Sequence, residues 1–139
     1  MKFKNPMIVV KDIDASVKFY QDVLGLQVIN DFGANKTLTG GISLQSEQTY
    51  QQFIQNQDIY YGGKNFELYF EEDDFDSFIK KLEEYSIHYV HPLVEHRWGQ
   101  RVIRFYDLDF HIIEVGENMK SVVKRFLDEG MNEQEVADR

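Results

Sequence analysis

The feature that most constrains the fold of this chain is an internal repeat. When the sequence is shifted by 62 positions, from Asp12 to Asp74, one helix start falls on another, and a later stretch aligns at a slightly larger shift. A repeat of this kind indicates two copies of one supersecondary unit, so it outranks any single motif in predicting the fold. The aligned segments are Asp12-Ile13-Asp14-Ala15-Ser16 with Asp74-Phe75-Asp76-Ser77-Phe78, Val28 with Val90, and Ile42-Ser43-Leu44 with Ile113-Glu114-Val115.

The first half of the chain has the pattern of a strand, a helix and three further strands. The apolar run 7–10 is typical of a short buried strand. Asp12 is suited to the N-cap of a helix, and Gly25 to the left-handed residue that ends one. We expect strands at 3–10, 26–32, 36–39 and 42–45, and a helix whose inward stripe is Ile13, Val17, Tyr20 and Leu24.

The second half repeats this order after a glutamine-rich connector, 47–63, with one expected helical turn. Apolar and polar side chains alternate over 66–70, and Asp73 or Asp74 is suited to cap the next helix. We therefore predict an α+β domain, 1–116, of two tandem βαβββ modules, 1–46 and 64–116. The expected strands are 66–70, 88–90, 100–106 and 110–115, and the inward helix residues are Phe75, Phe78, Ile79, Leu82 and Tyr85.

A short helical extension, 117–139, follows the second module. Asn118 is suited to cap its first helix, and Asn132 with Glu135 forms a capping box for one more turn. The run 125–137 is similar to the opening of a helix-turn-helix, but no recognition helix follows and the segment is acidic. Packing against the domain or a partner subunit is therefore favoured over DNA binding. The expected apolar face of the first helix is Val122, Val123, Phe126 and Leu127.

The charge balance narrows the classes of partner. The 139 residues carry 24 acidic and 15 basic side chains, a formal net charge of −9. A surface of that sign repels nucleic acid and anionic membranes, and it favours cationic small molecules. The chain has no cysteine, so disulfides and thiolate metal sites are excluded. Without a long apolar run either, we expect a cytoplasmic protein.

Two segments carry a family resemblance. The run VKDIDASVKFYQDVLGL, 10–26, resembles the N-terminal signature of the vicinal oxygen chelate superfamily, which includes glyoxalases, bleomycin-resistance proteins and extradiol dioxygenases. The run WGQRVIRFYD, 98–107, together with Ile113-Glu114-Val115, is similar to its C-terminal signature. The resemblance implies a glyoxalase-like fold whose mixed sheets curl around a cavity, and a homodimer. In the family's enzymes it also implies a divalent metal, held by the first and last strands of each module.

The resemblance also implies where metal ligands would lie. The first-strand and last-strand positions fall on Asn5 and Ser43 in module one, and on Glu67 and Glu114 in module two. The register leaves Asn65 open as an alternative to Glu67. Glu114 matches the family pattern, whereas Asn5 and Ser43 are poor ligands for transition metals. A complete metal site is therefore less expected than its loss.

Without a metal, Glu67 and Glu114 would repel each other inside one cavity. A protonated carboxyl, a neighbouring arginine or a cationic ligand would each resolve this. Arg101 and Arg104 lie on the adjacent expected strand and, being three apart, face opposite ways; which one points inward stays open. All four histidines lie between 88 and 111. His111 shares the expected strand of Glu114 on its opposite face, and His91 falls in an expected loop.

Aromatic side chains complete the candidate site. Trp98, the only tryptophan, and Tyr69, on the same strand face as Glu67, are suited to an aromatic wall that attracts cations. Trp98 is equally suited to plug the end of the sheet. The candidate ligand-binding residues are therefore Asn5, Ser43, Glu67, Tyr69, Trp98, Arg101 and Glu114.

Two functions are consistent with these residues. The favoured one is a metal-free protein that binds a small cationic or amphipathic molecule and has no cofactor. The alternative is a glyoxalase-type lyase or isomerase in which Glu67 and Glu114 hold Ni, Mn, Zn or Fe and Glu114 is catalytic. An extradiol dioxygenase is disfavoured, because its iron needs two histidines and a carboxylate.

Overall fold

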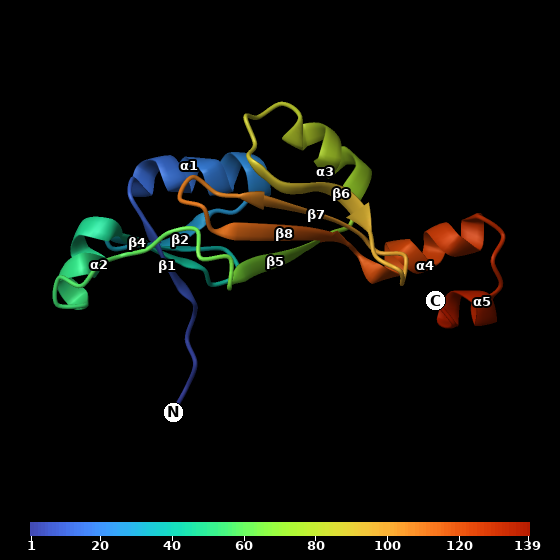
Figure 1. Cartoon of the computed structure of the whole chain (residues 1–139), viewed down its shortest axis with the longest axis horizontal. Coiled ribbons are helices and arrows are strands. Elements are labelled where there is room, and N and C mark those ends of the chain that lie inside the picture. Colours follow the sequence, from blue (N-terminus) through green and yellow to red (C-terminus); the bar gives the residue numbers. More distant parts are fainter. The chain divides into compact units, whose positions relative to one another are not determined.

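A computed structural model describes residues 1–139 as two compact units. The N-terminal unit comprises Met1–Gly63 with Asp107–Phe110, and the C-terminal unit comprises Lys64–Tyr106 with His111–Arg139. Each unit is built around one four-stranded mixed sheet (Figure 1).

The N-terminal unit packs one helix against its sheet. The buried residues Ile8, Val10 and Leu44 of the sheet and Tyr20 and Val23 of the helix form its core. The sheet has the order β1-β4-β3-β2, with β1 and β4 parallel and the other pairs antiparallel. Its elements are β1 Met7–Val10, α1 Ile13–Leu24, β2 Val28–Asp31, β3 Asn35–Leu38, β4 Ser43–Ser46 and α2 Glu47–Phe53.

The C-terminal unit repeats this arrangement, with α4 after β8 where α2 follows β4, and adds one helix, α5. Its sheet has the order β5-β8-β7-β6, again with one parallel pair, β5 with β8. Phe78 of α3 and Phe105 of β7 pack with ring centroids 6.4 Å apart, which fixes α3 on this sheet. Its elements are β5 Glu67–Glu72, α3 Phe75–Leu82, β6 Tyr89–Glu95, β7 Arg101–Tyr106, β8 Ile112–Glu117, α4 Met119–Asp128 and α5 Glu133–Ala137.

The two sheets have equivalent strand orders, which confirms the predicted pair of βαβββ modules and the α+β class. The helix caps are confirmed as well. The Asp12 carboxylate accepts from the amide of Ala15, the Asp74 carboxylate accepts from that of Ser77, and Gly25 is left-handed with φ 69°. These caps recur because each orphan amide of a first turn needs an acceptor, whichever module it belongs to.

Several strand boundaries differ from the sequence prediction. β1 begins at Met7 and not at residue 3, since Pro6 before it has no amide proton to donate. β8 begins at Ile112, because Phe110 lies in a turn with φ 64°; His111 therefore precedes the strand instead of sharing it with Glu114. β6 runs from Tyr89 to Glu95, so His91 lies in a strand and the expected loop is wrong. Pro92 is tolerated there because β6 is an edge strand with irregular pairing.

The buried faces of the helices are narrower than expected. Ser16, Tyr20 and Val23 are the buried residues of α1, while Ile13, Val17 and Leu24 are half-buried. The buried face of α1 is centred on Tyr20, whose hydroxyl donates to Asp107 at 2.7 Å. On α3 the buried residues are Phe75, Phe78 and Leu82; Ile79 is half-buried, and Tyr85 lies beyond the helix end.

The C-terminal extension forms both predicted helices. Asn118 caps α4, and Asn132 with Glu135 forms the capping box of α5. Val122 and Phe126 are buried on α4, whereas Val123 and Leu127 are exposed, so its packed face is half the predicted one. No helix of the chain combines the length and the apolar character needed to cross a membrane.

Candidate functional site

The strand registers place the four family positions at equivalent points of the two modules. Ser43 of β4 lies opposite Met7 of β1, and Asn5 precedes Met7 by two residues. Glu114 of β8 lies opposite Tyr69 of β5, and Glu67 precedes Tyr69 by two residues. This equivalence favours Glu67 over Asn65, which precedes β5.

In the C-terminal unit, Glu67 and Glu114 converge on one guanidinium. Arg104 Nε donates to Glu67 at 2.8 Å, and Arg104 Nη2 donates to Glu114 at 2.7 Å. The three residues lie on β5, β8 and β7, and they share one face of the sheet because Arg104 is paired directly with Glu114. Arg104 thus supplies the positive charge that two neighbouring carboxylates require.

The two carboxyls differ in protonation. Burial and the neighbouring Glu67 carboxyl together raise the pKa of Glu114 to about 7, against the pull of Arg104. The hydrogen bond from Arg104 lowers the pKa of Glu67, so this carboxyl stays ionised. Glu114 is only 7% exposed. At neutral pH the site therefore holds one firmly ionised carboxylate and one carboxyl that can gain or lose a proton.

His91 of β6 extends this group, and we call Glu67, His91, Arg104 and Glu114 the carboxylate–arginine cluster. His91 Nε2 lies 3.3 Å from Arg104 Nη1, and His91 Nδ1 lies 2.7 Å from the carbonyl oxygen of Pro92. Both contacts are hydrogen bonds when Nδ1 carries the proton and Nε2 accepts. In that tautomer His91 orients the Arg104 guanidinium.

An aromatic edge continues the same sheet face. Gln100 Nε2 donates to the Tyr69 hydroxyl at 3.0 Å, and Trp98 Nε1 donates to Gln100 Oε1 at 3.2 Å. Trp98 also stacks on His96 with ring centroids 4.2 Å apart. Tyr69 and Trp98 remain 49% and 45% exposed, so each offers a ring face beside the cluster.

Gly116 of β8 makes this edge possible. A Cβ at position 116 would lie 2.8 Å from Gln100 Nε2 and 3.2 Å from the Tyr69 hydroxyl. The position has no left-handed φ, so this glycine leaves room for the Gln100 and Tyr69 side chains and is not needed for backbone conformation.

Arg101, by contrast, lies away from the cluster. Its guanidinium donates to Glu117 at 3.0 Å and to Asp76 at 2.8 Å. The alternation of β7 directs it to the opposite sheet face from Arg104. Of the sequence-predicted site residues, the structure thus brings together Glu67, Tyr69, Trp98 and Glu114, and it does not bring Arg101 to them.

In the N-terminal unit the equivalent positions form a neutral polar group. The Asn5 side chain donates a hydrogen bond to the Ser43 hydroxyl, and Thr37 Oγ1 lies 3.3 Å from the same oxygen. Thr37 is paired with Ser43 as Arg104 is with Glu114. Beside them, Gln45 accepts from Asn35 at 2.9 Å. This module has hydroxyls and amides at the positions where the C-terminal unit has charged side chains.

A divalent metal of the glyoxalase type does not fit these residues. Arg104 already binds oxygens of both carboxylates, so they cannot also supply the set of ligands that a divalent metal needs. Nowhere in the chain do three or more histidine, aspartate or glutamate side chains gather in a way that could hold a metal ion. Asn5 and Ser43 bond each other and are weak ligands.

Sequence reasoning singled out the carboxylates but missed several of their neighbours. Thr37, Gln45 and Gly116 lie outside the two signature segments, and Gln100 lies inside the second one, which assigned it no role. The roles of all four arise from strand pairing. Along β3, β4 and β8, Thr37, Gln45 and Gly116 alternate with the buried residues Leu38, Leu44 and Val115, and this alternation is the one signal that pointed to this face.

Two βαβββ modules with polar residues at the first-strand and last-strand positions define a protein of the vicinal oxygen chelate superfamily. The match to the glyoxalase-like domain family model spans residues 3–120, and the chain belongs to that family.

Solved structures agree with this membership. A protein of unknown function from Agrobacterium tumefaciens str. C58 is 38% identical, with a TM-score of 0.76 over 85% of this chain and 94% of that one. A glyoxalase/bleomycin resistance protein/dioxygenase family enzyme from Burkholderia phytofirmans PsJN is 21% identical, with a TM-score of 0.70 over 82% and 96%. The genomically encoded fosfomycin resistance protein FosX from Listeria monocytogenes is 17% identical, with a TM-score of 0.67 over 88% and 97%. No curated protein matches the chain.

Proposed function

We propose that this chain is a metal-free binding protein for a small cationic, amphipathic molecule. The observation that carries the proposal is Arg104, whose guanidinium lies between the two carboxylates that would otherwise be metal ligands. With that charge built in, the carboxylate–arginine cluster has no need of a metal ion. It is a preformed polar end for an organic ligand.

The ligand class follows from charge and aromatic surface. Arg104 directs its donors to Glu67, Glu114 and His91, so it has little to offer an anion. Glu114 ionises near pH 7 and would hold an amidinium or ammonium group. Tyr69 and Trp98 would cover the apolar part of the ligand and attract its charge through their rings.

Other features support the same class. The net charge of −9 draws cations toward the protein. The names of the Burkholderia and Listeria proteins mention resistance to bleomycin and fosfomycin. Toxic small molecules are therefore the first natural compounds to test.

Benzamidinium and phenyltrimethylammonium are suitable probes, with neutral benzamide as the isosteric control for the former. We expect both cations to raise the melting temperature and quench Trp98 fluorescence, and benzamide to do neither. E114Q should weaken cation binding by about tenfold, the usual loss for one charge-assisted hydrogen bond. E84Q, which removes an exposed carboxylate after α3, should bind like the wild type. Equal binding of benzamide and benzamidinium would contradict the proposal.

The metal-dependent lyase or isomerase is tested separately. Protein purified without chelator should contain no near-stoichiometric Ni, Mn, Zn or Fe, and adding these ions should not stabilise it. A stability gain on adding one of them, lost in E67Q and E114Q, would replace the proposed function with the enzymatic one.

We also propose that the protein is a cytoplasmic homodimer, as the family membership suggests. Sedimentation velocity measures the mass directly, and fractionation of the source cell measures the location. A species of 16.5 kDa at micromolar concentration would reject the dimer.

A further inference from the structure

The turn between β6 and β7, residues 96–100, carries two residues of the aromatic edge. It is closed by hydrogen bonds from His96 N to Gln100 O at 2.9 Å and from Gly99 N to His96 O at 2.7 Å. Gly99 has φ 90°, a conformation that favours glycine. The position of this turn decides where Trp98 and Gln100 lie on the sheet face.

Helix α4 packs directly against this turn. Arg125 Nη2 donates to the Gly99 carbonyl oxygen at 2.6 Å. The Phe126 ring lies so close that a Cβ on Gly99 would be 2.0 Å from its Cζ. Phe126 is 3% exposed, so this contact is a packed one and not a surface approach. The glycine at 99 thus serves both its own φ and the close approach of α4.

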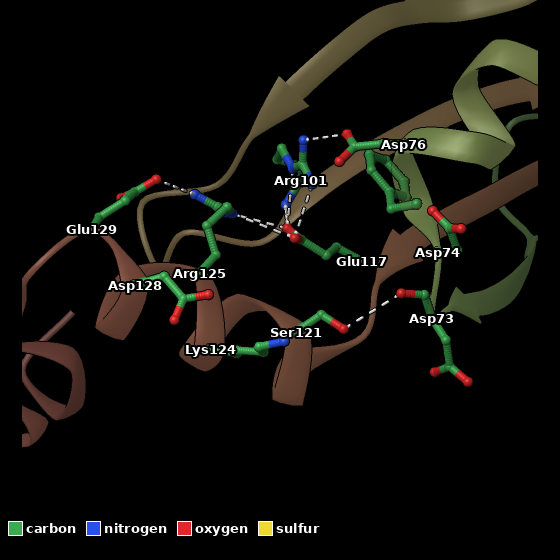
Figure 2. Close-up of a pocket in the computed structure, with 11 residues that line it drawn as sticks. Asp73, Asp74, Asp76, Arg101, Glu117, Ser121, Lys124, Arg125, Asp128 and Glu129 are labelled. Atoms are coloured by element: carbon green, nitrogen blue, oxygen red, sulfur yellow. Dashed lines mark hydrogen bonds and ion pairs between the residues drawn. The ribbon is translucent and has the colours of Figure 1, made fainter.

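A buried carboxylate fixes Arg125 in place. Glu117, 3% exposed, accepts from Arg125 Nη2 at 3.2 Å and from Arg101 Nη2 at 3.0 Å, and Arg101 reaches on to Asp76 of α3 (Figure 2). Burial alone would raise the pKa of Glu117, but the hydrogen bonds from the two arginines lower it, so the carboxylate stays charged. Breaking a buried pair of this kind is costly, which makes the arrangement stiff.

We propose that α4 positions the aromatic edge of the ligand-binding face, with Arg125 and Phe126 as positioning residues that do not touch the ligand. The inference rests on the proposed function for its ligand. Arg125 and Phe126 hold the 96–100 turn against the sheet end, and Trp98 and Gln100 are thereby placed beside Tyr69. The extension after the βαβββ modules then supports the binding site without touching the ligand.

The single tryptophan makes the inference measurable without any ligand. In R125Q, the acrylamide quenching constant of Trp98 should rise about twofold in the folded protein, because the turn loses its charge-assisted bond. The affinity for benzamidinium should fall by about tenfold. R125K, which keeps a donor and the charge, should recover part of both. V123S, on the exposed side of α4, is the matched control and should change neither.

A double-mutant cycle on Gly99 and Phe126 tests the packing contact. G99A should disturb Trp98 quenching strongly, and F126L should reduce that disturbance by giving the new methyl group room. If R125Q lowers the melting temperature but leaves both Trp98 quenching and benzamidinium affinity unchanged, α4 is only a structural support and the inference is rejected. If the wild type binds no cation, the proposed function fails, while the quenching data on the free protein still decide whether α4 positions Trp98.

Discussion

At the scale of single residues, the ionisation of Glu114 makes one contribution to the pH dependence of stability. Its pKa in the folded protein is about 7, above its ordinary value of 4.5, so folding favours the protonated carboxyl. The wild type must therefore lose stability, relative to a variant without this group, as the pH rises from about 4.5 to about 7. We expect the free energy of unfolding of E114Q minus that of the wild type to rise across this window by up to about 1.4 kcal/mol per pH unit.

Urea unfolding at half-unit steps from pH 4 to 8.5 measures this difference. Below pH 4.5 and above pH 7 the difference should be flat, and E84Q serves as the control for removing one carboxyl. A difference that does not change with pH would mean that Glu114 is ionised throughout, and the protonation assigned to the cluster would be wrong.

At the scale of elements, β8 depends on the absence of a side chain at Gly116. G116A would push a methyl group against Gln100 and Tyr69, and we expect a loss of about 1–3 kcal/mol of stability from overpacking. Trp98 emission should shift as well, because its indole is bonded to Gln100. The double variant G116A/Q100A should cost less than the sum of the single variants, measured by urea unfolding. Additive costs would show that positions 116 and 100 do not interact.

Local features of the fold could be predicted from the sequence, and features that depend on strand pairing could not. Asp12 was predictable as a helix start, and the second start was predictable to Asp73 or Asp74, because a cap acts within three residues; the structure has Asp74. The end of β8 and the inclusion of Pro92 in β6 were not, because they depend on pairing with distant strands.

The candidate site divides in the same way. Glu67 and Glu114 were accessible from the repeat and the family pattern, but the choice of Arg104 over Arg101 required knowing which face of β7 each occupies. The contact of Thr37 with Ser43 could be predicted only from the pairing of β3 with β4, which the sequence does not give.

At the scale of the whole molecule, the net charge of −9 should govern how fast a cation arrives. The Debye length falls from about 30 Å at 0.01 M salt to about 8 Å at 0.15 M, so the attraction acts over most of a small domain only at low salt. We expect the association rate of benzamidinium, followed through Trp98 fluorescence by stopped flow, to fall by up to about tenfold over this range. The dissociation rate should change little, because it reports contacts at the cluster.

A charge variant separates this long-range effect from local binding. Replacing the exposed Glu83 and Glu84 by lysine removes one negative charge and adds one positive charge at each position. The formal net charge therefore changes from −9 by +4 to −5. At low salt E83K/E84K should bind benzamidinium more slowly than the wild type, and at 0.15 M salt the two rates should converge with equal dissociation rates. A salt-independent association rate would mean that the acidic surface serves solubility alone, and cation selectivity would then have to come from Glu114 and the aromatic edge by themselves.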